Sequence, residues 1–521
     1  MKKFSSILAR VGQLLSAIFI VWLFVTSMMY QTVLLLDNSE LARIYQLPLW
    51  LYLILLLIIV VFSLMLLRLP QISGSVLVIT GLIFYLVLGL IMISSIDWEI
   101  KNDAYQVFIN GRLFDKGDYV PFAEGGYLNK YPHQLGLLTF ERLIWFLSLY
   151  KNQKIFFFIN LVLVLLNQYY GLILTKQLFK NQIVIKIYAV ITFLFLPQLF
   201  SIFFVYGILP GTFFATVGLV KLGRYLEQKR LGDFITCIMF LAISYIIRNN
   251  FIILFVAISI VLILYSIKEK SKRELILIGS IFTLSFSGNY FNKSYYEIKT
   301  SQQLNGLPKV VWLAMGLGNS TDSPRLPGWY DESVENTYYQ NNGDLKKIEK
   351  INRIKLEQNV SKLTQDESFA TKFFLTKFVS TWSDGNFQTL WSGPSTFVKG
   401  EIKLKWIEDL YSGKGLFRQV IIFGHIVLII IYLGLVLAIT RLLASPIRDN
   451  LFALIPVFYL VGGILFHLVW ETKSQYAYPY IILALPVSAY GLYLLGYLGV
   501  RLRRFGQWYL RHLLQVFSRN N

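Results

Sequence analysis

The sequence predicts an all-α polytopic membrane protein with about 12 transmembrane helices, interfacial helices in the first large outer loop and a mostly helical outer cap segment. Of the 521 residues, 55% are hydrophobic and only 15% are charged, whereas about a quarter of the residues are charged in a typical soluble domain. Apolar runs of about twenty residues recur along the chain. They lack the alternation of barrel strands, so helices must satisfy the backbone hydrogen bonds inside the hydrocarbon.

Twelve apolar runs are candidate spans. They cover residues 11–36, 47–67, 76–96, 155–175, 183–203, 205–222, 232–247, 251–267, 274–290, 418–440, 451–469 and 477–499. The first run follows Lys2, Lys3 and Arg10, as the core of a signal peptide would. Its apolar part is too long for a signal peptide and further spans follow it, so we predict that it is a membrane helix.

Basic residues predict the orientation of these spans. The chain has 49 Lys and Arg against 29 Asp and Glu, a net charge of +20. The basic residues concentrate in alternate short loops and in the C-terminal tail, while the other loops hold most of the acids. This pattern follows the positive-inside rule and predicts a multi-pass protein with both termini in the cytoplasm. The Lys/Ile/Asn-rich composition favours a bacterial plasma membrane. No basic cluster is interleaved with exposed aromatic residues, so no nucleic-acid partner is predicted.

Two long polar stretches divide the spans into groups. The predicted segments are N-terminal transmembrane helices (1–96), a first outer loop with an interfacial helix (97–154), central transmembrane helices (155–290), an outer soluble-like segment (291–417), C-terminal transmembrane helices (418–499) and a basic cytoplasmic tail (500–521). The aromatic and glycine content of 291–417 predicts an ordered cap and not a disordered linker. One cysteine, Cys237, lies in an apolar run, so the chain has no disulfide framework.

Candidate chemistry concentrates just after the third apolar run. No phosphate-cradling glycine loop, Cys/His metal cluster or nucleophile elbow is present. Asp97, Glu99 and Asp103 lie within seven residues after Ile96. A carboxylate at this position can act as a general base toward a hydroxyl, or as a ligand for a divalent cation that offsets a phosphate. The alternative is that these acids begin an ordinary solvated loop.

This loop resembles a known family. The stretch from Asp97 through Asp103-Ala-Tyr105, then Gly111, then the segment 126–136 with its Tyr-Pro-His-Gln element, is similar to the first outer loop of the GT-C superfamily of lipid-phosphate-sugar glycosyltransferases. That superfamily includes the protein mannosyltransferases and the aminoarabinose transferases. Asp97 stands at the spacing to Gly111 expected of the catalytic acid. Asp103-Ala-Tyr resembles an alternative form, so the resemblance leaves both acids as candidates, with Glu99 beside them.

A second element lies near the C-terminus. The sequence Glu471-Thr-Lys473-Ser-Gln-Tyr476-Ala-Tyr-Pro479 resembles the Glu…Arg-Tyr…Pro element that opens the last spans of many such enzymes. Gln475 stands where that family commonly has Arg, so this sequence departs from the family's phosphate-binding pattern at that position, and Lys473 could supply the positive charge instead.

Arg248 points to an anionic lipid independently of the resemblance. It interrupts two apolar runs, where an arginine is costly unless it snorkels to the surface or meets an anion. A guanidinium can bind a phosphate through two parallel hydrogen bonds. A snorkelling arginine is the alternative interpretation. With the resemblance, the predicted substrate-binding residues are Glu124, Tyr127, Lys130, Tyr131, His133, Gln134, Arg248, Glu471, Lys473 and Tyr476.

The resemblance implies a membrane glycosyltransferase. It would move a sugar from a polyprenyl-phosphate-linked donor to a cell-envelope glycan, a teichoic-type polymer or a protein acceptor on the outer face. No cofactor is predicted except a possible divalent cation, held by Asp97 and Asp103 if one is used. A transporter or flippase of lipid-linked glycan is one rival, but the repeat symmetry of such proteins is absent from the sequence. An O-antigen-type polymerase or ligase is the other, although Arg325 and Arg353 of the long outer segment lie in ordinary solvated contexts.

Overall fold

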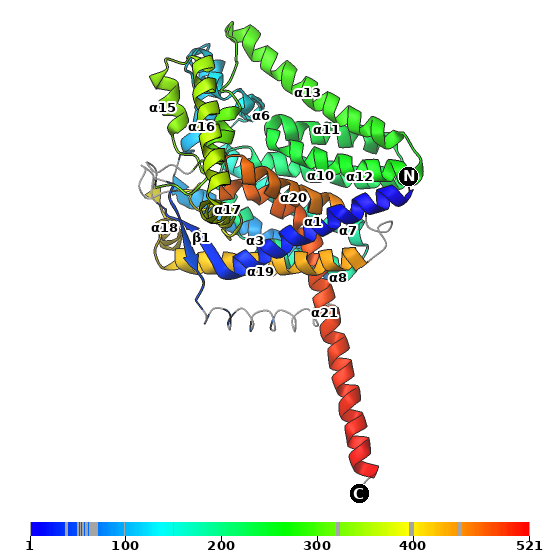
Figure 1. Ribbon diagram of the computed structural model, residues 1–521. Helices are drawn as coiled ribbons and strands as arrows, with labels where there is room; N and C mark the ends of the chain where they lie inside the picture. Colours follow the sequence, from blue (N-terminus) through cyan, green and yellow to red (C-terminus); the bar gives the residue numbers. More distant parts are fainter. Residues whose placement is uncertain are drawn as a thin grey trace.

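The protein is described here from a computed structural model. It covers residues 2–36, 40–48, 71–97, 99–149, 151–318, 324–394, 401–444 and 451–519, with a few single positions between 49 and 70. These residues are overwhelmingly helical, which confirms the all-α prediction. Strands within the described residues form two short antiparallel pairs. The helices pack into one elongated bundle (Figure 1).

Six helices of the described chain are long and apolar enough to cross a membrane. They are α1 (Lys2–Met29), α3 (Gly74–Ser95), α7 (Lys154–Phe179), α12 (Ile252–Glu269), α19 (Gly415–Ala444) and α21 (Ser474–Arg519). Helix α8 (Gln182–Leu194) continues after a 52° bend into α9 (Pro197–Phe200) and η4 (Ser201–Phe203), which makes a seventh span if the bent pair counts as one. These helices are compatible with a multi-pass membrane protein.

Four more of the predicted spans are helices outside that set. They are α10 (Ile208–Gln228), α11 (Leu231–Ile247), α13 (Arg273–Thr300) and α20 (Leu454–Val469). Helices α11 and α20 are apolar but have only 17 and 16 residues, while α10 and α13 carry charged residues over part of their length. The predicted span 47–67 lies largely outside the described residues. The total of twelve spans therefore stays a prediction.

The first predicted span, 11–36, is too long at its C-terminal end. Helix α1 ends at Met29, and β1 (Tyr30–Leu34) then pairs antiparallel with β2 (Ala42–Gln46). Thr32 donates through its backbone N–H to the carbonyl of Ser383 (2.9 Å) and through its hydroxyl to the carbonyl of Val379 (3.0 Å). These partners lie about 350 residues away in sequence, so an apolar run alone does not reveal that the helix stops.

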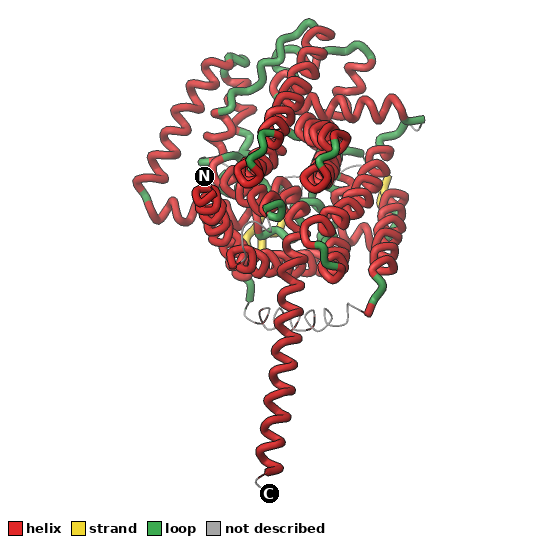
Figure 2. The backbone as a smooth tube through the Cα atoms, turned by 90° about the vertical axis from the view of Figure 1, so that its right-hand side faces the viewer, coloured by secondary structure: helices red, strands yellow, loops and turns green. Residues whose placement is uncertain are grey.

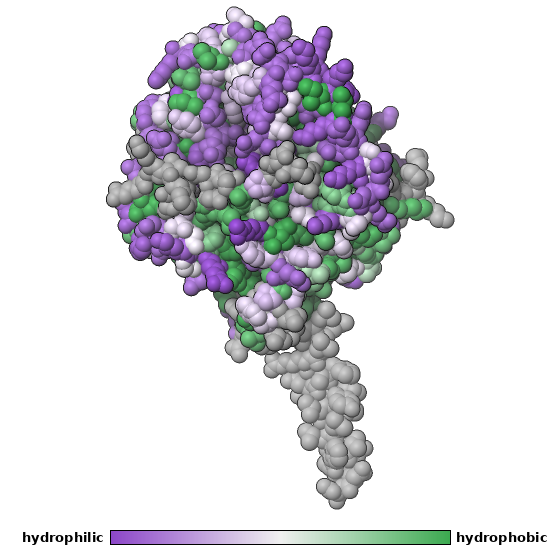
Figure 3. All heavy atoms as spheres, turned by 60° about the vertical axis from the view of Figure 1, so that its left-hand side comes forward, coloured by the Kyte–Doolittle hydropathy of each residue, from purple (hydrophilic) through white to green (hydrophobic). Residues whose placement is uncertain are grey.

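Folded polar segments cover one end of the bundle, which we call the capped end (left in Figure 1). They are α4 (Asn102–Asp115), η2 (Val120–Phe122), α5 (Tyr127–Lys130), η3 (Pro132–Gln134), α6 (Leu135–Leu147), α14 (Val310–Gly316), α15 (Ser333–Gln340), α16 (Leu345–Gln365), α17 (Glu367–Trp382) and α18 (Lys405–Tyr411). A short pair of strands, β3 (Ile96–Asp97) and β4 (Glu401–Ile402), ties the end of α3 to the region before α18. In Figure 3 hydrophilic residues dominate the upper part of the surface, and hydrophobic side chains gather lower down.

Basic loops gather at the opposite end. Lys180 at the end of α7 pairs with Glu227 of α10 (2.9 Å), and Lys229 after α10 pairs with Glu274 of α13 (2.7 Å). Arg10 of α1 donates to the carbonyl of Leu443 in α19. The start of α1 and the basic ends of α7, α10 and α19 therefore share one end of the bundle, away from the capped end (Figure 1). The C-terminal part of α21 extends past the bundle as a single helix (Figures 1 and 2).

Helices α19 and α21 cross closely because two glycines face each other. A Cβ added to Gly491 would lie 1.7 Å from the carbonyl oxygen of Gly434, so no side chain fits without moving a backbone. We expect Gly491→Ala to destabilise the protein by about 1–3 kcal/mol through overpacking, measured as thermal unfolding in detergent. Gly279→Ala is the matched control, because a Cβ there meets no atom within 4 Å. Equal melting temperatures for both variants would contradict the close crossing.

Candidate active site

A cluster of polar side chains lies at the capped end of the bundle, and we call it the polar cluster. Its central members are Glu40, Asp103, Tyr206, Arg248, Glu471 and Lys473. Contacts or electrostatic interactions join each of them to at least one other member. They come from five separate stretches of the chain: the loop before β2, the first turn of α4, the loop before α10, the end of α11, and the loop between α20 and α21, which carries Glu471 and Lys473.

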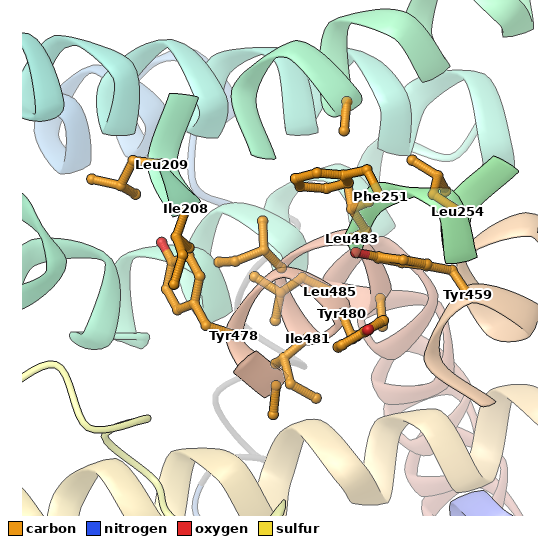
Figure 4. Packing of buried hydrophobic residues seen from close by; sticks show 14 of the residues in the cluster. Ile208, Leu209, Phe251, Leu254, Tyr459, Tyr478, Tyr480, Ile481, Leu483 and Leu485 are labelled. Atoms are coloured by element: carbon orange, nitrogen blue, oxygen red, sulfur yellow. The ribbon is translucent and has the colours of Figure 1, made fainter. Parts of the chain in front are cut away.

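The apolar core of the bundle adjoins this cluster. The ring of Tyr459 stacks on that of Phe251, with ring centroids 6.4 Å apart (Figure 4). It also packs at a tilt against the ring of Tyr480, with centroids 4.4 Å apart. A cavity of about 20 Å³, enough for one water molecule, lies between these rings, Tyr476 and Arg248. The packed rings therefore lie next to Arg248, on the same small cavity.

Of the acids at 97, 99 and 103, Asp103 is the one that belongs to the cluster. Its side chain is accessible to water although protein surrounds it. The Tyr206 hydroxyl lies 3.4 Å from Asp103 Oδ2, and Gln134 Nε2 donates to the Tyr206 oxygen at 2.6 Å. Burial raises the pKa of Asp103, while Lys473 opposes the rise and Glu40 adds to it. An enclosed carboxylate that water still reaches is suited to accept a proton from a bound hydroxyl.

Arg248 lies over the ring of Tyr206. Its guanidinium carbon is 4.7 Å from the centre of the Tyr206 ring, and the side chain is partly exposed. Within the described residues no carboxylate forms an ion pair with it. Together with burial, which is the larger effect, Arg248 lowers the pKa of His133 to about 4. His133 is therefore neutral at pH 7, and the positive charge in this part of the cluster is that of Arg248.

Lys473 forms a buried ion pair with Glu40. Its Nζ lies 2.8 and 2.9 Å from the two carboxylate oxygens of Glu40. Gln388 Nε2 also donates to Glu40 (2.6 Å), and Arg325 Nη1 lies 3.6 Å from it. Burial alone would lower the pKa of Lys473, but Glu40 and Glu471 raise it. Lys473 is thus charged and held in one position.

Glu471 is a second enclosed carboxyl group. It is 6% exposed, and the Tyr476 hydroxyl lies 3.5 Å from its Oε1. The loop that carries it is fixed by backbone hydrogen bonds to Trp312 (3.2 Å) and Gly328 (2.9 Å). Burial raises the pKa of Glu471 to about 7, although Lys473 opposes the rise. A carboxyl group with this pKa can give or take a proton near neutral pH.

The raised pKa of Glu471 makes stability depend on pH. The fold favours the protonated form, so its stabilising effect is complete below pH 4.5 and is lost as the pH rises through about 7. The difference between the two pKa values corresponds to roughly 3 kcal/mol. We expect the melting temperature of the wild type to fall relative to that of Glu471→Gln between pH 5 and pH 8. Parallel melting curves over this range would contradict the shift.

Lys130 and Tyr131 both contact Glu335, an acid at the capped end of the bundle. Lys130 Nζ and the Tyr131 hydroxyl each lie 2.5 Å from a carboxylate oxygen of Glu335 in α15. Lys130 is buried and already neutralised, so it is less suited than Arg248 to bind an anion. Burial raises the pKa of Tyr127, and the nearby Tyr206 and Asp103 raise it further. Glu124 is exposed.

Asp97 and Glu99 lie apart from the cluster. The Asp97 side chain is 74% exposed and pairs with Lys154 at 3.4 Å, and Glu99 is exposed as well. Among the described residues the ion-pair partner of Asp97 is Lys154, so the geometry gives no support to a divalent cation between Asp97 and Asp103. Among the described residues no three His, Cys, Asp or Glu side chains gather closely enough to hold a metal ion.

Sequence reasoning did not select several residues of the site. They are Glu40, Tyr206, Arg325, Tyr330, Glu335 and Gln388. Tyr206 lies in an apolar run, and Glu40 shares a short loop with a second acid, Asp37, so neither stands out by pattern. The contact between Lys473 and Glu40 joins positions 433 residues apart, and only the folded chain reveals it.

Fold and cluster together describe an all-α protein with several membrane-compatible helices and an enclosed polar site at one end. Comparison with models of protein families, with curated proteins and with solved structures finds no match to this chain.

Proposed function

We propose that this protein is a membrane glycosyltransferase. It transfers a sugar from a polyprenyl-phosphate-linked donor to a hydroxyl of a cell-envelope glycan, a teichoic-type polymer or a protein. The observation that carries the proposal is that Asp103 and Arg248 both contact Tyr206, Asp103 at its hydroxyl and Arg248 at its ring, with Glu471 and Lys473 in the same cluster. A proton acceptor and a cation in one enclosed site are what this reaction needs.

Arg248 is the group that binds the donor phosphate. It is the cation of the cluster without a carboxylate partner in the described chain, whereas Glu40 neutralises Lys473. A guanidinium holds a phosphate through charge-assisted, parallel hydrogen bonds. The polyprenyl chain then extends along the apolar side chains of the bundle, where a lipid tail is favoured.

Asp103 acts as the general base. The acceptor oxygen attacks the anomeric carbon and its proton passes to the Asp103 carboxylate. The bond between the anomeric carbon and the phosphate oxygen breaks, and polyprenyl phosphate leaves with the bonding electrons. Arg248 stabilises the negative charge that develops on the leaving phosphate. Attack opposite the leaving group inverts the anomeric configuration, and Glu471 with Tyr476 positions the acceptor.

The proposal is tested with purified protein in liposomes and a panel of polyprenyl-monophosphate sugars. Release of polyprenyl phosphate and labelling of an envelope glycan are measured for the wild type, Asp103→Asn, Arg248→Ala and the control Asp97→Asn. We expect release with one donor class, and its loss in the first two variants only. Movement of the lipid-linked sugar across the bilayer without release would identify a transporter or flippase. Absence of release with every donor would overturn the proposal.

A further inference from the structure

A basic groove lies between α4 and α6, outside the polar cluster. Its volume is about 760 Å³, and four cations line it: Arg112, Lys116, Arg142 and Lys151. Asp115 is the acid among the lining residues, so the lining carries an excess of positive charge. Arg142 pairs with Asp115 at 2.7 Å and also donates to the Tyr296 hydroxyl at 3.0 Å.

Arg112 is the unusual member of this lining. Its side chain is only 10% exposed, and its guanidinium lies 4.6 Å from the centre of the Trp145 ring. It forms an ion pair with Asp115 at 3.0 Å. Apart from this contact with Asp115, its buried guanidinium nitrogens have no hydrogen-bond partner within the described chain. Buried guanidinium groups are rarely left in this state, because each unsatisfied donor costs free energy.

Exposed apolar side chains border the same groove. Leu143 and Phe146 line it and are 54% and 80% exposed. Leu147 is the last residue of α6 and is 66% exposed, and Leu149, two residues further on, is 101% exposed. Large apolar side chains on a short helix beside basic residues are typical of a helix that lies in the membrane interface. Cations at that depth meet the phosphates of lipid headgroups.

We propose that this groove binds the phosphate headgroup of an anionic phospholipid. The positive charges of Arg112, Lys116 and Lys151 attract the phosphate, and the exposed Lys116 and Lys151 donate hydrogen bonds to its oxygens. Leu143 and Phe146 contact the acyl chains. This site is separate from the proposed glycosyltransferase site and does not depend on it.

Native mass spectrometry of the full chain in detergent tests the site with short-chain phosphatidylglycerol, phosphatidylcholine of equal chain length, and inorganic phosphate. We expect phosphatidylglycerol to bind at least about tenfold more tightly than phosphatidylcholine. We expect Arg112→Gln to remove that preference. The control Arg353→Gln removes an exposed arginine of α16 and should leave the preference unchanged.

Two further variants keep the test decisive if Arg112→Gln does not fold. Glu141 is buried near Arg112, and its carboxylate has no hydrogen bond within the described chain. The double variant Arg112→Gln/Glu141→Gln therefore leaves no uncompensated charge in the interior. Lys116→Gln/Lys151→Gln changes exposed residues only. Equal binding of both lipids, unchanged preference in all three variants, or displacement of the lipid by equimolar inorganic phosphate would each overturn the proposal.

Discussion

Asp103→Asn is expected to lower the rate constant kcat of sugar transfer by roughly 10²- to 10⁴-fold, the usual contribution of a general base. The amide keeps the size of the side chain and can still contact Tyr206, whose hydroxyl lies 3.4 Å from Asp103. It cannot accept the proton of the acceptor hydroxyl. The KM for the donor should change little, because the proposed phosphate ligand is Arg248. Steady-state release of polyprenyl phosphate measures both constants.

Asp97→Asn is the matched control for this prediction. Asp97 lies only six positions earlier in the chain, but it is exposed and paired with Lys154. We expect near wild-type kcat in this variant. Loss of activity in Asp97→Asn with full activity in Asp103→Asn would show that the base has been assigned to the wrong acid.

Arg248→Ala is expected to lower kcat/KM for the donor by about 10- to 100-fold, because hydrogen bonds to a charged group contribute about 1.5–3 kcal/mol. Loss of phosphate binding raises the KM for the donor, and loss of charge stabilisation lowers kcat. The KM for the acceptor should stay the same. Arg248→Lys retains the charge but not the two parallel donors, so its kcat/KM should lie between those of the wild type and Arg248→Ala.

Arg353→Ala controls for the loss of a positive charge in general. Arg353 is 65% exposed and pairs with Glu349 on the surface of α16, so we expect wild-type kinetics. An unchanged KM for the donor in Arg248→Ala would exclude Arg248 as the phosphate ligand. Correct folding of each variant is checked by its melting temperature.

The sequence predicted the helical fold because an apolar run in hydrocarbon leaves the backbone few alternatives to a helix. All predicted spans within the described residues contain helices. The lengths and bends of these helices depend on contacts with distant parts of the chain. Helix α1 ends seven residues before its apolar run does, at Met29, because the following strand bonds to β2 and to the end of α17. Hydropathy alone therefore does not determine the number of membrane spans.

The candidate site was predicted in part. Asp103, Arg248, Glu471 and Lys473 were selected from the sequence, and the structure gathers them in one cluster. The sequence could not separate Asp97 from Asp103, because both follow the same apolar run. In the structure Asp97 belongs to a surface strand and Asp103 to the first turn of α4, which turns its side chain toward Tyr206.

By itself the sequence determined where the helices form, since local hydrophobicity and backbone hydrogen bonding act over neighbouring residues. Tertiary structure alone decided which polar side chains meet. Glu40 and Lys473 are 433 residues apart, yet they form one buried ion pair. Burial in the fold, and not residue type, raises the pKa of Glu471 to about 7, although Lys473 opposes the rise. Those properties depend on distances and solvent exclusion, which exist only once the chain has folded.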